Sequence, residues 1–336
     1  MKRNISHRLA GFVSAAAAVI SAAVLLTPAA LAQDSYPSRP VHVIVPFSTG
    51  GAADVSARLI GAKLGETLKQ PFVIENHAGG EGIPALDLVK RAAPDGHTLG
   101  IISNANAARQ ATMRKLPWDL DRDFAYIAVA VDSTIVLVGN PQKVKAASLA
   151  QLTGELRSAP EKYHYGSCGV LSTHRFAMEK YRYLTQAVAR HVPYKGCAFA
   201  TTDVIGGQIE LAMVTLSDVL SHVKSGRLRA YGVTTAERNA TAPDVPTFRE
   251  SGIPELKDYE QVAWYGFAAP AGTPQPIVNK LAAEIERALA NPEVSGKLRA
   301  AGLAPAFHGP KQTAAMMKAE VKSFKQVSAA AGITAE

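Results

Sequence analysis

The sequence predicts an α/β protein built from two units, each with a mainly parallel sheet flanked by helices. Three observations support this prediction: strand-like and helix-like segments alternate, a long apolar run interrupts the alternation near the middle, and the alternation then resumes. The length of 336 residues agrees, because it corresponds to roughly two domains of about 150 residues. A hydrophobic content of 47% with 19% charged residues allows substantial cores and excludes intrinsic disorder.

Residues 1–32 have the features of a signal peptide. Three basic residues precede an apolar, alanine-rich run at 9–26, and Ala30-Leu31-Ala32 fits the small-x-small pattern that signal peptidase recognises. We therefore expect export and cleavage after Ala32. An uncleaved membrane anchor is the alternative, which the polar residues that follow directly disfavour. Because Gln33 stands after the cleavage site in place of cysteine, a lipid-anchored lipoprotein is also disfavoured.

The expected mature chain is mildly basic. Removal of three positive charges with the signal peptide changes the formal net charge from +8 to +5. The remaining Lys and Arg residues form no long run and aromatic residues make up 7% of the chain, so nucleic-acid binding has little support. Two cysteines, with no Cys-x-x-Cys or His-x-x-x-His motif, give no indication of a metal site. The charge suits small anionic ligands better.

The first unit follows the order strand, helix, strand, helix, strand. Each expected strand is a short β-branched or apolar run, and proline or glycine residues separate it from segments with helical spacing of apolar residues. This order predicts a parallel sheet. The expected elements are a strand at 41–45, a helix at about 55–68, a strand at 72–75, a helix at 83–92 and a strand at 98–102.

A long apolar run from Tyr126 to Val138 separates the two units. Because it is longer than a typical strand, we expect it to carry the chain from one lobe to the other. The expected division is residues 33–132 plus 246–336 for lobe 1 and residues 133–245 for lobe 2. The elements expected after the run are a helix at 148–158, a strand near 164–166, a helix after Ser172, a strand at 191–194, a helix ending near 206–207, strands at 209–214 and 228–234, an apolar segment at 264–269, and helices at 276–290 and 311–331.

Two strand-to-helix loops are candidates for holding an anion, Pro46 to Asp54 and Tyr165 to His174. In an open parallel sheet, ligands bind outside the carboxyl ends of the strands, where helix N-termini present free N–H groups. The Gly-Gly pair of the first loop lets the backbone approach a carboxylate, and Ser172 or Thr173 is expected to cap the helix after the second. A plain turn and a plain cap are the alternatives. Neither loop has the lysine of a P-loop or the third glycine of a dinucleotide fingerprint, so no nucleotide cofactor is expected.

An exported hydrolase is a weaker alternative. Ser167 or Cys168 could serve as a nucleophile with His174 or His191 as its base. However, Gly166-Ser167-Cys168-Gly169 is not a Gly-x-Ser-x-Gly motif, and the sequence identifies no third residue that would orient either histidine. We therefore expect a binding protein rather than an enzyme.

Short motifs with a fixed order extend along the mature chain. They are Tyr36-Pro37-Ser38-Arg39-Pro40, Val45-Pro46-Phe47 with Gly50-Gly51 and Asp54, Ala93-Pro94-Asp95-Gly96, Lys115-Leu116-Pro117-Trp118-Asp119, His191-Val192-Pro193-Tyr194-Lys195-Gly196, Gly206-Gly207-Gln208, Asp244-Val245-Pro246-Thr247 and Ala269-Pro270-Ala271-Gly272-Thr273-Pro274. In these motifs the chain resembles the Bug family, the extracytoplasmic solute receptors of tripartite tricarboxylate transporters. The resemblance implies a two-lobed periplasmic binding protein whose lobes are joined by crossing strands and close on a carboxylate-bearing solute.

The resemblance also implies a ligand site. The ligand carboxylate would meet backbone N–H groups around Gly51, Ala52 and Ala53, partly through water, and Ser103 and Asn104 would complete that lobe. The second loop would form the opposing wall, with Tyr194 nearby. The residues expected to contact the ligand are Phe47, Ser48, Thr49, Gly51, Ala52, Ala53, Asp54, Ser103, Asn104, Ser167, Cys168, Ser172, Thr173 and His174.

The ligand itself stays open among C4-dicarboxylates, citrate-like acids, acidic amino acids and aromatic carboxylates. This chain departs from the family at Ser48-Thr49, where proline is frequent, and at Cys168 and Cys197, which replace small residues. The expected partners are a small carboxylate and the membrane permease subunits of a tripartite transporter, and the protein is expected to be a periplasmic monomer without cofactor. A carboxylate sensor that feeds a signalling partner is the alternative.

Arg109 stands where the family commonly has asparagine. Its position shortly after Ser103-Asn104 could bring a cation to the mouth of the site, where it would grip a second carboxylate. A solvated helix residue is the alternative.

The two cysteines are a natural pair in an exported protein. Cys168 and Cys197 belong to loops that would emerge at the same carboxyl edge of a parallel sheet, so we expect a disulfide between them. Two reduced thiols that act as small apolar fillers are the alternative.

Overall fold

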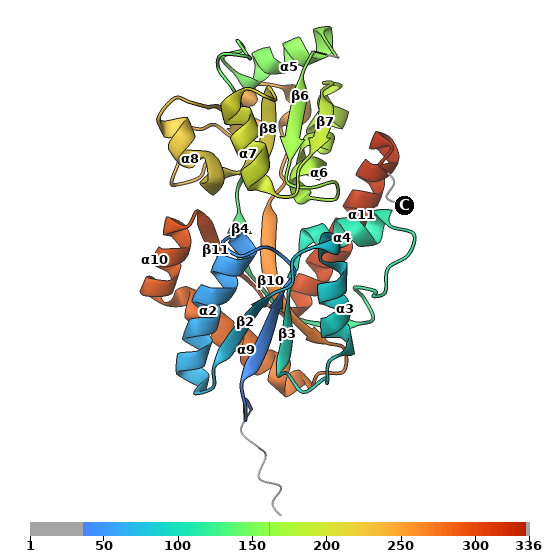
Figure 1. Cartoon of the computed structure of the whole chain (residues 1–336), viewed down its shortest axis with the longest axis vertical. Coiled ribbons are helices and arrows are strands. Elements are labelled where there is room, and N and C mark those ends of the chain that lie inside the picture. The colour runs from blue at the N-terminus through green and yellow to red at the C-terminus, as the bar shows by residue number, and fades with distance from the viewer. Residues whose placement is uncertain (1–35, 161, 334–336) are drawn as a thin grey trace, which may run out of the picture. The chain divides into compact units, whose positions relative to one another are not determined.

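Two β-sheets organise the part of the chain that the computed structural model describes, which comprises residues 36–160 and 162–333. The predicted signal peptide lies outside these residues. Both sheets belong to the unit that begins at Arg39, and Figure 1 shows each sheet with its own flanking helices, so that the unit contains two α/β lobes. In the described part of the chain, no helix combines the length and the apolar character needed to cross a membrane.

The first sheet has six strands in the order β11-β4-β10-β3-β1-β2. β1 is parallel to β2 and β3, with Val43 opposite Ile74 and Leu99, whereas β10, β4 and β11 continue the sheet in antiparallel fashion. β1 is buried on both faces, as its Val-His-Val-Ile-Val run requires. The strands are β1 Val41–Val45, β2 Phe72–Asn76, β3 Thr98–Ser103, β4 Phe124–Ser133, β10 Ala263–Pro270 and β11 Leu303–His308.

Helices on both sides of the first sheet bury apolar stripes against it. α11, the longest of the described helices, contributes Met317 and Phe324 to a core that also contains Trp118 and Trp264. The helical elements of this lobe are α2 Ala52–Leu68, the 3₁₀ turn η1 Gly80–Gly82, α3 Ile83–Arg91, α4 Asn104–Thr112, α9 Gln275–Ala290, α10 Pro292–Ala300 and α11 Pro310–Ala331.

The second sheet has five strands in the order β7-β6-β8-β5-β9. β6 is parallel to β7 and β8, and β5 is antiparallel to β8 and β9. The strands are β5 Ile135–Gly139, β6 His164–Ser167, β7 Arg190–Pro193, β8 Leu211–Thr215 and β9 Arg229–Val233. The helical elements are α5 Leu149–Ser158, α6 Thr173–Thr185, α7 Cys197–Gly206, α8 Leu216–Lys224, η2 Arg249–Ser251 and η3 Pro254–Leu256.

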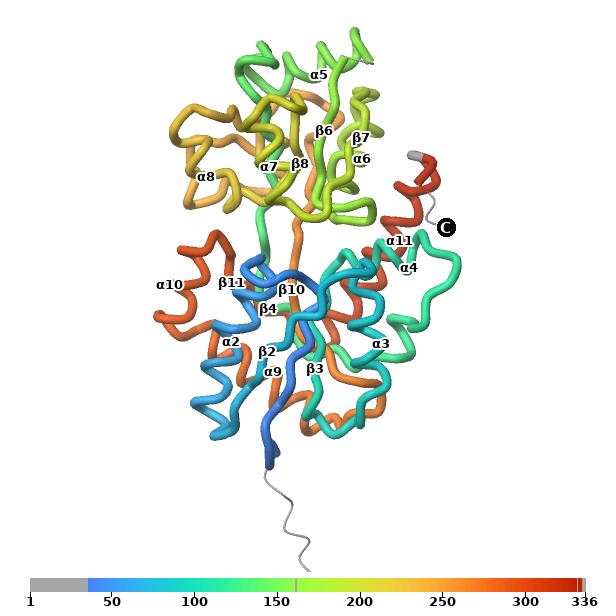
Figure 2. The backbone as a smooth tube through the Cα atoms, viewed as in Figure 1, coloured from blue at the N-terminus to red at the C-terminus, as the bar shows by residue number. Residues whose placement is uncertain are grey.

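The chain passes between the sheets in two places, which Figure 2 traces as the green and orange segments between the lobes. On the outward path, only Thr134 separates the end of β4 from the start of β5. On the return path, Phe248, Leu256 and Tyr259 pack in the core of the second lobe before β10 joins the first sheet at Ala263. On this packing we propose a lobe boundary near residue 262, later than the division at 246 that the sequence suggested.

Both sheets are mixed, whereas the sequence suggested mainly parallel sheets. The run from Tyr126 to Val138 forms two strands, because β4 ends at Ser133 in the first sheet and β5 begins at Ile135 in the second. The strands that connect the lobes pair in antiparallel fashion. In the first sheet β4 is antiparallel to β10, and in the second sheet β5 is antiparallel to β8. The expected helices and strands of the first unit lie where they were predicted, within a few residues at their ends.

Candidate functional site

The sequence placed the first loop at Pro46 to Asp54. In the structure it ends at Gly51, where it joins β1 to α2, and Asp54 in the first turn of α2 binds its backbone. The Gly50 N–H donates to Oδ2 of Asp54 at 2.9 Å, and Asn76 Nδ2 donates to Oδ1 at 2.9 Å. Arg58 pairs with the same carboxylate at 2.9 Å. Burial raises the pKa of Asp54, but hydrogen bonds from Arg58, the Gly50 N–H and Asn76 outweigh burial and lower it. Asp54 therefore stays ionised and fixes the loop, and its oxygens already have partners.

Gly50 provides the conformation that this loop needs. Its φ of +84° lies in the left-handed region, whereas Gly51 has an extended φ of −78° and forms the N-cap of α2 without a side-chain cap. Ser48, Thr49 and Gly51 are exposed. The first N–H groups of α2 have no acceptor within the helix, and the helix dipole favours an anion there. The loop thus presents an uncapped, accessible helix N-terminus, and Phe47 stands edge-on to Tyr265 beside it with 5.7 Å between ring centroids.

Ser103 and Asn104 begin α4 at the end of β3, and both are almost completely buried. Asn106 accepts a hydrogen bond from the Ser103 N–H at 2.8 Å, which caps the helix. Asn104 donates from Nδ2 to the Val262 carbonyl at 2.6 Å and accepts from Thr173 Oγ1 at 2.8 Å. The two lobes therefore touch through a pair of residues that the sequence assigned to opposing walls of the site.

Hydrogen bonds to the Gly169 carbonyl close the second loop into a turn. Ser167 Oγ donates to the Gly169 carbonyl at 3.0 Å and lies 2.7 Å from His191 Nε2. The single hydroxyl proton of Ser167 can serve only one of these two contacts, and the tautomer of His191 decides which group donates in the second. Burial, with smaller contributions from Arg175 and Arg182, lowers the pKa of His191 to about 3. Ser172 caps α6 by accepting from the Arg175 N–H at 3.2 Å, as expected.

Cys168 and Cys197 form a disulfide bond, which confirms the predicted pairing. His174 is buried beside it, with Nε2 3.1 Å from Thr215 Oγ1 and 3.7 Å from Cys197 Sγ. Burial lowers the pKa of His174 to about 4, so its imidazole is neutral at neutral pH. The ligand atoms of Cys168, His174 and Cys197 lie within 4.8 Å of one another, the spacing of a metal site. Metal binding needs thiolates, however, and the disulfide removes both.

Arg109 is a buried residue, so the alternative of a solvated helix residue is wrong. Its exposed fraction is 5%, and Nη2 donates to Glu81 Oε2 at 3.0 Å. Burial lowers the pKa of Arg109, against the opposing effect of Glu81. No sequence signal pointed to Glu81, because a glutamate between glycines has the composition of any exposed turn.

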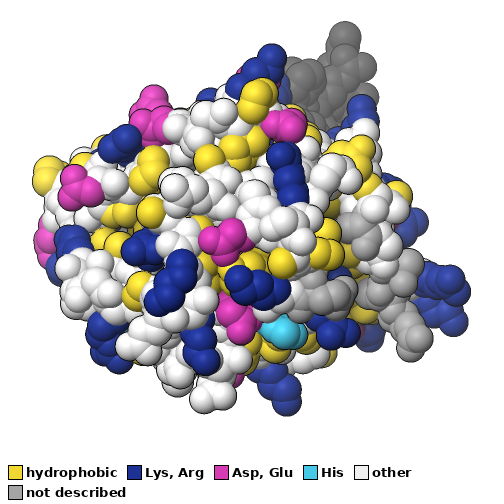
Figure 3. Space-filling view, turned by 90° about the horizontal axis from the view of Figure 1, so that it is seen from above, with side chains coloured by type: hydrophobic (Ala, Val, Ile, Leu, Met, Phe, Trp, Pro, Cys, Tyr) yellow, Lys and Arg dark blue, Asp and Glu magenta, His cyan; other side chains and the backbone are white. Residues whose placement is uncertain are grey.

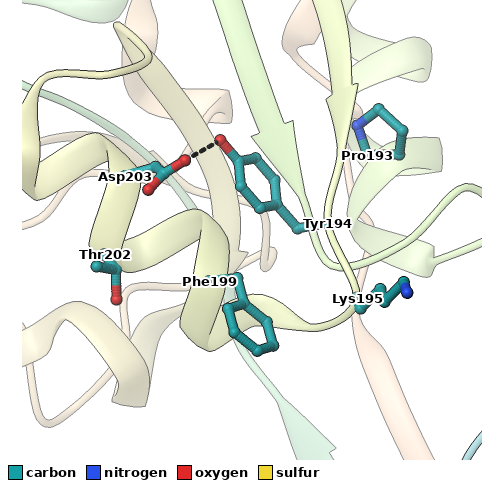
Figure 4. A pocket seen from close by; sticks show the side chains of 6 residues that line it. All are labelled: Pro193, Tyr194, Lys195, Phe199, Thr202 and Asp203. Carbon is teal, nitrogen blue, oxygen red and sulfur yellow. Dashed lines mark hydrogen bonds between the residues drawn. The ribbon is translucent and has the colours of Figure 1, made fainter.

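A pocket of about 530 Å³ opens in the second lobe at the connection from β7 to α7. Figure 4 shows Tyr194 reaching across it to Asp203, whose Oδ2 accepts from the tyrosine hydroxyl at 2.7 Å. Phe199 lies at the rim and is 62% exposed, and Lys195 adds a cation. Tyr194 was expected near the site, but none of the residues predicted to contact the ligand lines this pocket.

The face in Figure 3, which looks onto the second lobe, carries Lys and Arg side chains scattered among acidic and apolar ones rather than gathered in one patch. This distribution gives no support to nucleic-acid binding on that face, in agreement with the sequence.

Comparisons with known proteins identify the relatives of this chain. Residues 56–333 match the family described as tripartite tricarboxylate transporter family receptor. MatC (Rpa3494) from Rhodopseudomonas palustris, solved with bound malate, is 31% identical and superimposes with a TM-score of 0.75 over 87% of this chain and 99% of its own. The R. palustris protein Rpa4515, solved with adipate, is 31% identical with a TM-score of 0.80 over 89% of this chain and 99% of its own. The periplasmic binding protein BugD is 27% identical with a TM-score of 0.78 over 90% and 100%.

These matches confirm the resemblance that the motifs carried and the fold class of a two-lobed α/β periplasmic binding protein. The family consists of binding proteins rather than enzymes.

Proposed function

We propose that this chain, which belongs to the family of tripartite tricarboxylate transporter receptors, captures a small carboxylate in the periplasm and delivers it to the membrane subunits of a tripartite transporter. Export rests on the signal-like residues 1–32. The protein acts as a monomer without cofactor.

The observation that carries this function is the first loop. Asp54, Asn76 and Arg58 fix its backbone from the buried side, while its exposed side presents the uncapped N-terminus of α2. An anion at that position would accept hydrogen bonds from the N–H groups of Gly51, Ala52 and Ala53. Because these donors are neutral amides, the loop holds a carboxylate without burying a side-chain cation beside it.

The remaining predicted residues act mainly by shaping the site. Ser103 and Ser172 cap helices, and Asn104 and Thr173 bind each other. The disulfide ties the second loop to the start of α7. We infer that these residues position the walls, and that Phe47, Ser48 and Thr49 lie against the ligand.

The two related proteins that were solved with adipate and malate support a carboxylate ligand. A receptor that feeds a sensor uses the same binding step, so the two roles share this site and differ in the membrane partner. The genes that neighbour the coding sequence distinguish them, because a transporter role predicts two membrane subunits there and a sensing role predicts a kinase.

A thermal-shift screen of the mature protein against mono-, di- and tricarboxylates tests the function. A micromolar ligand corresponds to about −8 kcal/mol of binding free energy, and at about a hundredfold excess over Kd it stabilises the fold by about 2.7 kcal/mol. We expect at least one acid to give such a shift and its primary amide to give none. A panel in which every acid and amide behaves alike contradicts the proposal.

A further inference from the structure

The guanidinium of Arg109 has fewer partners than a buried charge needs. It lies on α4 with 5% of its surface exposed, and its one hydrogen bond to a described residue runs from Nη2 to Glu81. Nε and Nη1 are buried and have no partner among the described residues. An arginine carries five N–H donors, and leaving them desolvated and unpaired is costly. The site is therefore one acceptor group short.

Glu81, the present partner, belongs to an unusual stretch of backbone. Four consecutive residues have a positive φ, which favours glycine: +108° at Gly79, +52° at Gly80, +55° at Glu81 and +73° at Gly82. Glu81 is the one residue of the four that is not a glycine. The side chain of Glu81 is 40% exposed, whereas the side chain of Arg109 is 7% exposed. Solvent thus reaches the ion pair from the side of Glu81.

This ion pair lies beside the first loop. The His77 N–H donates to the Val45 carbonyl at 2.9 Å, which aligns the chain after β2 with the end of β1. A Cβ on Gly82 would stand 2.8 Å from Pro46 Cβ, so the glycine turn packs directly against the start of the loop. Contacts therefore lead from Pro46 through Gly82 and Glu81 to Arg109, all at the carboxyl edge of the parallel strands, where α/β sheets bind ligands.

We propose that Arg109 recognises a second carboxylate of the ligand, and that Glu81 occupies this position when no such ligand is bound. The inference rests on the proposed function, in which the first carboxylate binds at the N-terminus of α2. The second carboxylate displaces Glu81 from Nη2 and also accepts from Nη1, so that the planar guanidinium holds it through two parallel hydrogen bonds. The ligand class is then a dicarboxylate, or a larger acid that carries a second carboxylate at that distance.

Matched acids of equal chain length test this assignment by isothermal titration calorimetry on the mature protein. The probes are succinate with butyrate and adipate with hexanoate. We expect Arg109→Gln to weaken binding of the preferred diacid by about tenfold or more, and to change binding of the monoacid by less than about twofold. Arg91→Gln is the matched control, because Arg91 also pairs with a carboxylate, Asp87, but is 73% exposed on α3; this variant should bind as the wild type does.

Glu81→Gln separates recognition from mere support. If Glu81 holds the place of the ligand, its loss removes a competitor, and the diacid should bind about threefold or more tightly. If Glu81 only steadies Arg109, the same variant binds the diacid more weakly, which overturns the proposal. Should Arg109→Gln fail to fold, Arg109→Lys keeps the charge without the planar fork and is expected to lose part of the diacid preference.

The outcomes also distinguish this inference from the proposed function. Equal losses for diacid and monoacid in Arg109→Gln, or a wild type that binds monoacids as well as diacids, overturn the role of Arg109 and leave a carboxylate receptor. A wild type that binds no carboxylate overturns both.

Discussion

Thr173 donates a hydrogen bond from Oγ1 to Oδ1 of Asn104 at 2.8 Å, and this contact joins the first turn of α6 in the second lobe to the first turn of α4 in the first lobe. Both side chains are nearly inaccessible, with 3% and 1% of their surface exposed. Asn104 also donates to the Val262 carbonyl, at the residue before β10 returns to the first sheet. The polar atoms that the sequence assigned to the ligand are therefore used to connect the lobes.

This connection predicts energetic coupling between the two residues. In a double-mutant cycle of Thr173→Val and Asn104→Ala, the coupling free energy should be about 1 kcal/mol, because the hydrogen bond is buried and each variant leaves the other partner unsatisfied. Urea denaturation of the four proteins measures it. Additive effects of the two substitutions would mean that the contact contributes nothing to stability.

Gly51→Val should damage ligand binding far more than folding. A side chain fits at this position, because the nearest atom to a Cβ on Gly51 is the Ser48 carbonyl oxygen at 3.6 Å, an ordinary contact. The φ of −78° at Gly51 suits valine, and the positive φ of the loop belongs to Gly50, which is unchanged. The valine methyls would instead cover the N–H groups that meet the ligand. We expect a loss of affinity of about tenfold or more, measured by calorimetry, with a Tm near that of the wild type.

Gly154→Val in α5 is a suitable control, because a Cβ there meets no atom within 4 Å and the residue lies far along the chain from the first loop. If Gly51→Val binds carboxylates as this control does, the cradle lies elsewhere.

Loss of the disulfide should destabilise the protein. The bond joins cysteines that are 29 positions apart, and closing a loop of that size stabilises the fold by about 3 to 4 kcal/mol in the chain-entropy treatment. The Cys168→Ala/Cys197→Ala double variant should therefore unfold at a lower urea concentration than the oxidised wild type. Thiol titration of the denatured, unreduced protein provides the check, and two free thiols per chain would contradict the bond.

His174 predicts a loss of stability in acid. An unfolded histidine titrates near pH 6.5, whereas burial lowers the pKa of His174 in the folded protein to about 4. Below pH 6.5 the unfolded chain takes up a proton that the folded chain refuses until about pH 4, so the free energy of unfolding falls as pH falls through this window. Between pH 7.5 and pH 5 the contribution of His174 should decrease by about 2 kcal/mol.

The comparison of the wild type with His174→Gln isolates this contribution, since every other titrating group, including His191, is present in both proteins. The difference between pH 7.5 and pH 5 in the free energy of unfolding should be smaller in the variant by about 2 kcal/mol. An equal pH dependence of both proteins would show that His174 does not remain neutral inside the fold.

Much of the fold follows from local sequence signals. The Val-His-Val-Ile-Val strand of β1, the glycines of the first loop and the helix of α2 are each specified within a few residues, because β-branched runs, turn glycines and helical periodicity act locally. The order of the motifs indicated the family, and the match over residues 56–333 confirms it. The pairing of Cys168 with Cys197 was predictable because parallel strands bring their following loops to one edge.

Features that depend on partners distant in the chain were not predictable in this way. The run from Tyr126 to Val138 is apolar and β-branched on both sides of Asp132-Ser133-Thr134, and this polar triplet alone does not show that the chain changes sheet at Thr134. Asn104 and Arg109 have polar side chains that suit a ligand site, and only the fold reveals that Thr173 and Glu81 are their partners. The sequence therefore located the loops at the carboxyl edges of the strands more reliably than it identified the partner of each residue there.

The most direct test of carboxylate binding at the first loop is a ¹⁵N–¹H NMR titration of the mature protein with its best acid from the thermal-shift screen. We predict that the amide protons of Gly51, Ala52 and Ala53 shift downfield together, with the same midpoint as the calorimetric titration, since each would donate to the carboxylate. Unmoved amides at these three residues, with the largest shifts instead around the Tyr194 and Phe199 pocket, would contradict the assignment of the site.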